Sequence, residues 1–247
     1  MTTARVMLAE AIGTFFLCFA GIGAILSTQS PIDSGAGLVG IALAHGLALS
    51  IAINCFGGVS GGHHNPAVTV GMLVTGRIKS DRAIQYIIAQ LAGAIVAAFL
   101  CQALWPAEAV KSAALGIPLP PAANMPGAEG AWLTTGKLIA LEAIATFLLV
   151  TAVFGTAVDP RGQAVKIGGF GIGLTVAFDI LAIGPITGGS MNPARSFGPA
   201  LVHKLTGGET GAGAFDLHWC YWVGPIAGAI LAALIYERVI LGNDSHG

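Results

Sequence analysis

The sequence carries very little charge. Only 9% of its 247 residues are Asp, Glu, Lys or Arg, whereas 55% are hydrophobic. Soluble domains carry roughly 25% charged residues, so this composition excludes a chain that faces water on all sides. The 36 glycines agree with that exclusion, because small residues let transmembrane helices pack closely. The composition therefore predicts an integral membrane protein.

Patterns for metal, nucleic acid and catalysis are also missing. The cysteines have neither metal-site spacing nor a disulfide framework, and we interpret all four as small buried hydrophobic residues: Cys18, Cys55, Cys101 and Cys220. A net charge of −1 argues against nucleic acid as a partner. We expect no metal and no cofactor. An intramembrane enzyme would need a nucleophile with a base, or a metal constellation, and neither is apparent.

Long apolar runs indicate six transmembrane helices. About 17–25 apolar residues cross a bilayer as a helix, and six runs qualify: 5–27, 37–56, 83–104, 132–156, 166–183 and 218–240. We expect the first run to be a retained helix and not a signal peptide, because no small-residue cleavage site is convincing. Two shorter apolar segments, near 66–75 and 193–203, begin with Asn-Pro-Ala after a Gly-rich turn. Asn followed by Pro is a good helix start, which predicts two re-entrant half-helices.

The two halves of the sequence resemble each other at an offset of about 130 residues. Three echoes occur in the same order: Ala9–Phe15 in Leu141–Phe147, Ser60–Ala67 in Thr187–Ala194, and Leu91–Ile95 in Ile226–Ile230. Each half, about 1–110 and 130–247, contains three spans and one half-helix. An odd number of spans inverts the second copy in the membrane. We therefore expect an all-α membrane protein with a single domain (1–247), six transmembrane helices and two half-helices in an inverted repeat.

Basic residues predict the orientation. If the N-terminus is cytoplasmic, the inner side carries seven of them: Arg5, Arg77, Lys79, Arg82, Arg161, Lys166 and Arg238. The outer side carries Lys111, Lys137 and Lys204. This difference satisfies the positive-inside rule, so both termini are predicted to be cytoplasmic. The short tails and compact loops favour the plasma (inner) membrane over a vacuolar membrane.

The half-helices are expected to bring Asn65 and Asn192 to the same depth from opposite faces. Their N-termini would meet near the midplane and present unpaired N–H groups with positive dipole ends. Non-helical backbone at that depth must be buried in protein or line a wet cavity. The carbonyls before each asparagine would then form rows of acceptors for a file of water: Gly61, Gly62, His63 and His64, and Gly188, Gly189, Ser190 and Met191. Two amides donating to one water oxygen would interrupt a proton wire, and Arg195 would repel cations.

These residues carry a family resemblance. The strings His63–Thr69 and Met191–Ala200 contain two Asn-Pro-Ala motifs, with an arginine three residues after the second asparagine. Together with the topology, they resemble the aquaporin (major intrinsic protein) family over nearly the whole chain. The resemblance implies a passive channel for water and other small neutral solutes that excludes protons and ions. It also implies a homotetramer with one pore per subunit.

The resemblance further implies a selectivity filter at four positions: His45, Ile180, Gly189 and Arg195. This set is similar to that of plant tonoplast-intrinsic proteins, particularly a subgroup associated with ammonia as well as water. Its aliphatic and glycine members imply a wide aperture. Some ammonia channels carry an extra histidine in the third loop, and Ile117–Pro121 has none. A glycerol or small-polyol facilitator is the alternative, although that branch usually has Asp where this chain has Ser196.

Glu10 and Glu142 occupy equivalent places in the two halves. A gradient-coupled secondary transporter, which also shows inverted repeats and broken helices, would use such carboxylates to bind ions or relay protons. The resemblance implies instead a structural role, in which they accept hydrogen bonds from N–H groups of the half-helix loops. For Asp179, beside Ile180, a paired carboxylate shielded from lipid and a protonated acid both remain open.

Overall fold

The computed structural model describes residues 1–208 and 215–242. Six of its helices are long and apolar enough to cross a membrane: α1 (Thr3–Ser27), α2 (Gly37–Ser60), α4 (Ser80–Leu104), α6 (Thr135–Val153), α8 (Gly168–Thr187) and α10 (Cys220–Ile235). Two of them, α6 and α10, continue as the π-helices η3 (Phe154–Val158) and η4 (Tyr236–Leu241). The six spans confirm the predicted runs, because each boundary lies within four residues of its expected place.

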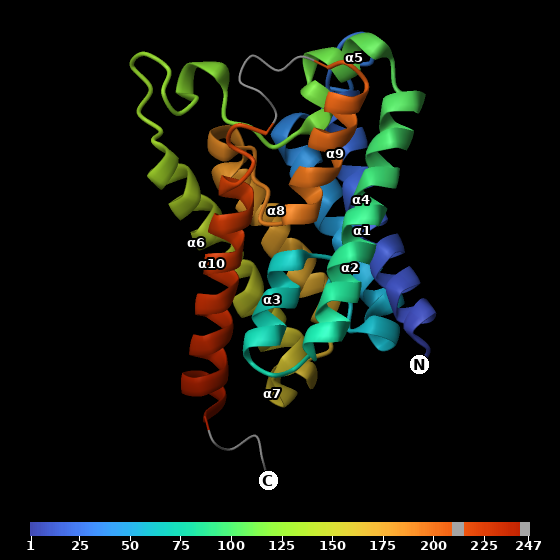
Figure 1. Cartoon of the computed structure of the whole chain (residues 1–247), viewed down its shortest axis with the longest axis vertical. Helices are drawn as coiled ribbons and strands as arrows, with labels where there is room; N and C mark the ends of the chain where they lie inside the picture. Colours follow the sequence, from blue (N-terminus) through green and yellow to red (C-terminus); the bar gives the residue numbers. More distant parts are fainter. Residues whose placement is uncertain (209–214, 243–247) are drawn as a thin grey trace.

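Two short helices, α3 (Pro66–Val74) and α9 (Pro193–Leu205), confirm the predicted half-helices. Each begins where an asparagine side chain caps the first turn. The Asn65 side chain accepts from the N–H of Ala67 at 2.8 Å, and the Asn192 side chain accepts from the N–H of Ala194 at 3.0 Å. With 9 and 13 residues, neither helix has the length to cross a bilayer. Both lie among the long helices (Figure 1).

The long helices pack in two groups that contain the two halves of the chain. In the first half α1 packs against α2 and α4, and in the second half α6 packs against α8 and α10. The pair α2 and α8 joins the groups. Each half-helix contacts the last long helix of the other half, α3 with α10 and α9 with α4. The residues before both asparagines are thereby brought to the centre of the molecule.

Glycine allows the closest of these helix contacts. A Cβ on Gly93 of α4 would lie under 3.0 Å from the carbonyl oxygen of Ala11 in α1, and one on Gly228 of α10 would lie equally close to that of Ala143 in α6. Small residues at such contacts are how helices approach each other in lipid, where no hydrophobic drive brings them together.

Short helical turns occupy the remaining connections. Three lie between α4 and α6: α5 (Ala107–Ser112), η1 (Ala114–Gly116) and η2 (Ala122–Asn124). One, α7 (Pro160–Gln163), lies between η3 and α8. These turns were not predicted, because three to six residues are too few to show a helical pattern in the sequence.

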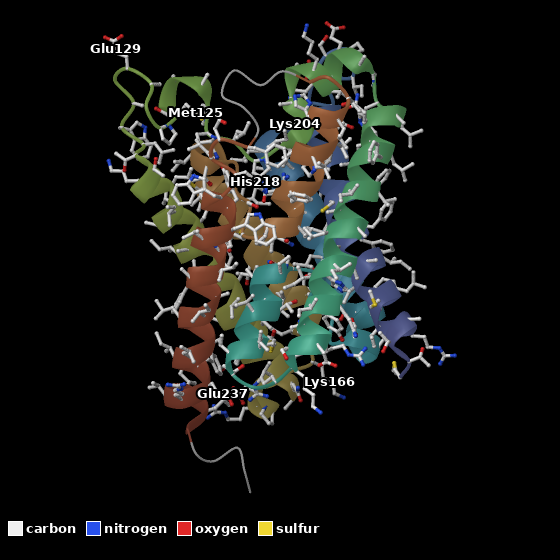
Figure 2. All side chains as sticks on the ribbon, viewed as in Figure 1. Met125, Glu129, Lys166, Lys204, His218 and Glu237 are labelled. Carbon is white, nitrogen blue, oxygen red and sulfur yellow. The ribbon has the colours of Figure 1, made fainter. Side chains whose placement is uncertain are left out.

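Charged side chains lie at the two ends of the molecule. Figure 2 shows Glu129 and Lys204 at one end and Lys166 and Glu237 at the other. Between them, large apolar side chains such as Ile88 of α4 are exposed, as expected for a surface in contact with lipid. The first residues of α1 and the end of η4 lie at the same end of the molecule (Figure 1).

Candidate pore and selectivity filter

A cavity of about 250 Å³ runs between the two halves and is lined by residues of both half-helix loops. Both asparagines line it, together with all four predicted filter residues. Its other walls come from aliphatic side chains of α1, α2, α6 and α8, among them Leu17, Leu49, Leu149 and Val176. The cavity therefore combines apolar walls with polar groups from the loops.

The two asparagines are bonded to each other's loops. The Nδ2 of Asn65 donates to the carbonyl oxygen of Met191 at 2.8 Å, and the Nδ2 of Asn192 donates to the carbonyl oxygen of His64 at 3.0 Å. Each amide nitrogen has two hydrogens, so one N–H on each side chain remains for the cavity. Both side-chain oxygens are occupied by the helix caps. Each asparagine therefore presents a donor to the cavity.

Buried glutamates hold the loops that carry these asparagines. Glu10 accepts from Ser60 Oγ at 2.6 Å and from the backbone N–H groups of His63 and His64 at 3.0 and 2.7 Å. Gln90 Nε2 completes this set at 2.8 Å. The carboxylate has 0% exposure and is not among the residues that line the cavity in the described part of the chain.

The second half repeats the arrangement. Glu142 accepts from Thr187 Oγ1 at 2.7 Å and from the backbone N–H groups of Ser190 and Met191 at 3.1 and 2.8 Å, and it too has 0% exposure. Both carboxylates are engaged by the loops in the way that the structural interpretation requires.

The residue before each asparagine has a left-handed backbone. His64 has a φ of 50° and Met191 a φ of 53°. For a residue other than glycine this conformation costs roughly 1–2 kcal/mol. The N–H of each residue donates to its glutamate and its carbonyl accepts from the opposite asparagine, and these bonds keep the strained backbone in place.

Six of the eight predicted acceptor residues line the cavity: Gly61, Gly62, His63, Gly189, Ser190 and Met191. The other two lie elsewhere within the described ranges. The ring of His64 packs against Gly13 of α1, where an added Cβ would overlap it. Gly188 caps α8 by donating to Gly184 and packs against Pro118.

The filter residues provide a hydrogen-bond acceptor, a hydrogen-bond donor and an aliphatic surface. His45 Nδ1 lies 2.8 Å from the carbonyl oxygen of Ile41. A carbonyl only accepts, so Nδ1 carries the proton and Nε2 of the neutral ring is an acceptor. Arg195 donates through Nη1 to the carbonyl oxygen of Gly116 at 2.8 Å. Among the described residues, neither His45 Nε2 nor Arg195 Nε has a hydrogen-bond partner. Ile180 adds an aliphatic surface.

Asp179 lies behind this filter and not in the cavity wall formed by the described residues. Its side chain is buried, with 2% exposure, and Oδ2 has no hydrogen-bond partner within residues 1–208 and 215–242. Of the two interpretations of Asp179, a paired carboxylate is therefore not supported at Oδ2.

The polar groups at the other end of the cavity could not be predicted from the sequence. Arg77 and Gln163 line the cavity there. The Arg77 guanidinium donates to both carboxylate oxygens of Glu237 in η4, at 2.7 and 3.0 Å, and lies 5.7 Å from the centre of the Phe154 ring. Because these residues are far apart in the sequence, no local pattern could reveal their pairing.

A second ion pair lies beside the first. Arg161 Nη2 is 2.7 Å from Asp159 Oδ2, and the hydroxyl of Tyr236 donates to the same oxygen at 3.2 Å. The hydrogen bonds from Arg161 lower the pKa of Asp159 to about 2. We call the residues Arg77, Asp159, Arg161, Tyr236 and Glu237 the Arg77–Asp159 cluster.

Comparison with known proteins identifies the family. Residues 1–236 match the family model described as major intrinsic protein. The chain belongs to this family. It is 42% identical to aquaporin TIP2-1 of Arabidopsis thaliana over 100% of this chain and 91% of that protein. It is 40% identical to aquaporin TIP4-4 of Zea mays over 98% of this chain and 89% of that protein.

A solved structure has the same fold. The aquaglyceroporin of Plasmodium falciparum aligns with a TM-score of 0.79 over 97% of both chains, at 23% identity. At that identity the likeness concerns the fold alone.

Membership of the family confirms three predictions: the aquaporin fold, a passive water channel, and a protein that is not an enzyme. It favours a channel over a gradient-coupled secondary transporter.

Proposed function

We propose that water crosses this protein in single file past Asn65 and Asn192, driven only by osmotic or concentration gradients. The observation that carries the proposal is the pair of crossed amides, each of which keeps one N–H for the cavity. Two such donors hold one water oxygen, so that its hydrogens point away along the file. Waters on the two sides of this central molecule are then oriented in opposite directions, and such a chain does not relay protons.

Arg195 and the two half-helices account for the exclusion of cations in this proposal. The arginine has 2% exposure and lies on the first turn of α9, next to the cavity. Positive ends of α3 and α9 add to its charge at the centre. A cation would lose its hydration in the passage and meet positive charge, and both effects raise the barrier.

We further propose His45, Ile180, Gly189 and Arg195 as the selectivity filter, with ammonia and other small neutral solutes as secondary substrates. Support comes from the unpartnered acceptor on His45 and donor on Arg195, which suit a small molecule that both donates and accepts. A backbone carbonyl, that of Gly116, orients the arginine. Glycerol is the alternative substrate, and the likeness to an aquaglyceroporin does not decide between the two because it concerns the fold alone.

A shrinkage assay in proteoliposomes tests the water channel. Vesicles that contain the protein should shrink much faster than protein-free vesicles under an osmotic step. The activation energy of water permeation should be low. When a pH difference is imposed across the vesicle membrane, the pH inside the vesicles should not change. Equal shrinkage rates in the two kinds of vesicle would refute the proposal, and solute-dependent ion flux would indicate a coupled transporter instead.

The filter assignment predicts a change in selectivity. Replacing His45→Phe together with Ile180→His fills the aperture, so glycerol and urea permeability should fall more than water permeability. Stopped-flow measurements on the same vesicles give the ratio. The control is Leu43→Phe, on the exposed side of α2, which should leave the ratio unchanged. An unaltered ratio in the double variant would show that these residues do not form the constriction.

We propose a homotetramer in which every subunit is one channel domain made of the inverted repeats 1–110 and 130–247. The matching bonds of Glu10 and Glu142 to the two loops support the repeat. Exposed apolar side chains on α2 and α8, such as Leu47 and Phe178, support close neighbours in the membrane. Cross-linking and native mass spectrometry of the purified protein should give four subunits, and a monomer would contradict the assembly.

The membrane in which the channel resides is a separate proposal. The chain is an integral membrane protein, and its compact loops favour the plasma (inner) membrane. Its similarity to proteins named TIP favours the vacuolar membrane instead. Fractionation of the source cells, with the protein followed by antibody, distinguishes the two.

A further inference from the structure

Gly21 lies in the middle of α1, where glycine is a poor helix former compared with alanine. A Cβ at this position would lie under 3.0 Å from its three nearest heavy atoms, and all three belong to the His45 ring. Nε2, Cδ2 and Cε1 are at almost equal distances from that point, so the ring lies face-on against the bare backbone of α1. Gly21 is buried, and it is not among the described residues that line the cavity, whereas His45 is. At the level of Gly21, the ring therefore lies between α1 and the passage.

The second half of the chain fills the corresponding place differently. The offset of Glu10 to Glu142 places Val153 of α6 opposite Gly21, and the offset of Asn65 to Asn192 places Ile172 of α8 opposite His45. Val153 and Ile172 belong to one buried cluster, and both line the cavity. One half thus pairs a glycine with a large ring, and the other pairs two aliphatic side chains of similar size. The volume missing from α1 is taken up by the histidine.

We propose that Gly21 is a positioning residue of the filter, because the absence of a side chain there lets the His45 ring withdraw from the passage. The inference rests on the proposed filter role of His45. Contact with α1 on one face and the bond from Nδ1 to Ile41 together fix the position and the tautomer of the ring. A methyl group at position 21 pushes the His45 ring away from α1. The ring then moves into the cavity, because the cavity is the space on its other side.

The test is a cycle of four proteins: wild type, Gly21→Ala, His45→Ala, and the double variant. Water, urea and glycerol permeabilities are measured in proteoliposomes, normalised to protein content. Gly21→Ala should reduce water permeability several-fold and the larger solutes more strongly, so the ratio of solute to water falls. In the His45→Ala background the methyl group meets no ring, and Gly21→Ala should then have no effect. Non-additivity of this kind isolates the contact between the two residues.

The matched control is Gly58→Ala. Like Gly21, Gly58 lies in a helix, but it is exposed, and an added Cβ there would meet nothing within 4 Å. It should leave permeability unchanged in both backgrounds. An effect of Gly21→Ala that persists without the His45 ring would overturn the inference. If Gly21→Ala does not accumulate in membranes, the same cycle is read from the yield. Recovery of yield in the double variant supports the inference, and no recovery overturns it.

Failure of the filter gives a different result. If His45→Ala alone leaves the ratio of solute to water unchanged, then His45 does not form the constriction and the proposed function is at fault. If His45→Ala raises the ratio while Gly21→Ala changes nothing, the filter stands and only the positioning role of Gly21 fails.

Discussion

Glu10 and Glu142 are charged groups that the pore does not use directly. Each carboxylate lies outside the cavity wall of the described residues and accepts several hydrogen bonds from one half-helix loop. Their position at the same point of the two halves suggested a relay of protons, whereas the family resemblance implied a support. The contacts favour support, because each carboxylate is engaged by three or four hydrogen bonds and neither is among the described residues that line the cavity.

Removing Glu142 should therefore destabilise the fold. Glu142→Ala leaves the N–H groups of Ser190 and Met191 buried without an acceptor. It also removes the shorter of the two hydrogen bonds that Thr187 Oγ1 donates. Each unsatisfied buried donor costs about 1–3 kcal/mol, so the melting temperature in detergent should fall steeply or the protein should fail to accumulate. Glu142→Gln retains one acceptor oxygen and should be milder. The exposed Glu108→Ala serves as control, and equal melting temperatures for Glu142→Ala and this control would contradict the supporting role.

At the scale of elements, run length and helix-start signals were enough to predict the six spans and the two half-helices. A bilayer imposes a minimum length on a spanning helix, and Asn followed by Pro marks a helix start. Contacts between segments far apart in the sequence could not be predicted in this way. The bond from Arg195 to Gly116 depends on a loop with no recognisable pattern, and the pair of Arg77 and Glu237 joins residues 160 positions apart.

The Arg77–Asp159 cluster joins α7 and η4 to the turn after α3 at one end of the cavity, and its stability should depend on pH. In the folded protein the pKa of Asp159 is about 2, below its ordinary value of 3.8. A carboxyl with a lowered pKa stabilises the folded state fully above the ordinary value, and this contribution is lost as the pH falls towards the folded value. The gap in melting temperature between wild type and Asp159→Asn should therefore be widest above pH 4 and close on approach to pH 2.

Glu129→Gln is the control for this element, because Glu129 is exposed at the opposite end of the molecule (Figure 2). It should leave the melting temperature unchanged across the same range. A gap for Asp159→Asn that does not narrow in acid would show that the ion pair with Arg161 does not hold the cluster.

At the scale of the whole molecule, the distribution of lysine predicts which end faces the cytoplasm. Lys204 and Lys166 lie at opposite ends of the molecule (Figure 2). A membrane-impermeant amine reagent applied to intact cells or right-side-out vesicles should modify Lys204 and leave Lys166 unmodified. Mass spectrometry of the digested protein reads both sites in one sample, and permeabilised membranes provide the control. Modification of Lys166 alone in sealed membranes would reverse the orientation and place both termini outside.

The crossed asparagine bonds also bear on how the protein is made. The partner of Asn65 lies 126 residues later in the sequence, and that of Asn192 lies 128 residues earlier. While the ribosome is still inserting the first three spans, Glu10 can already hold the loop of Asn65, but the amide of Asn65 has no carbonyl partner. The asparagine pair is therefore completed only after Met191 and Asn192 have been made, late in the synthesis of the chain. A truncated nascent chain leaves no half-open leak behind, since neither half alone encloses the water path.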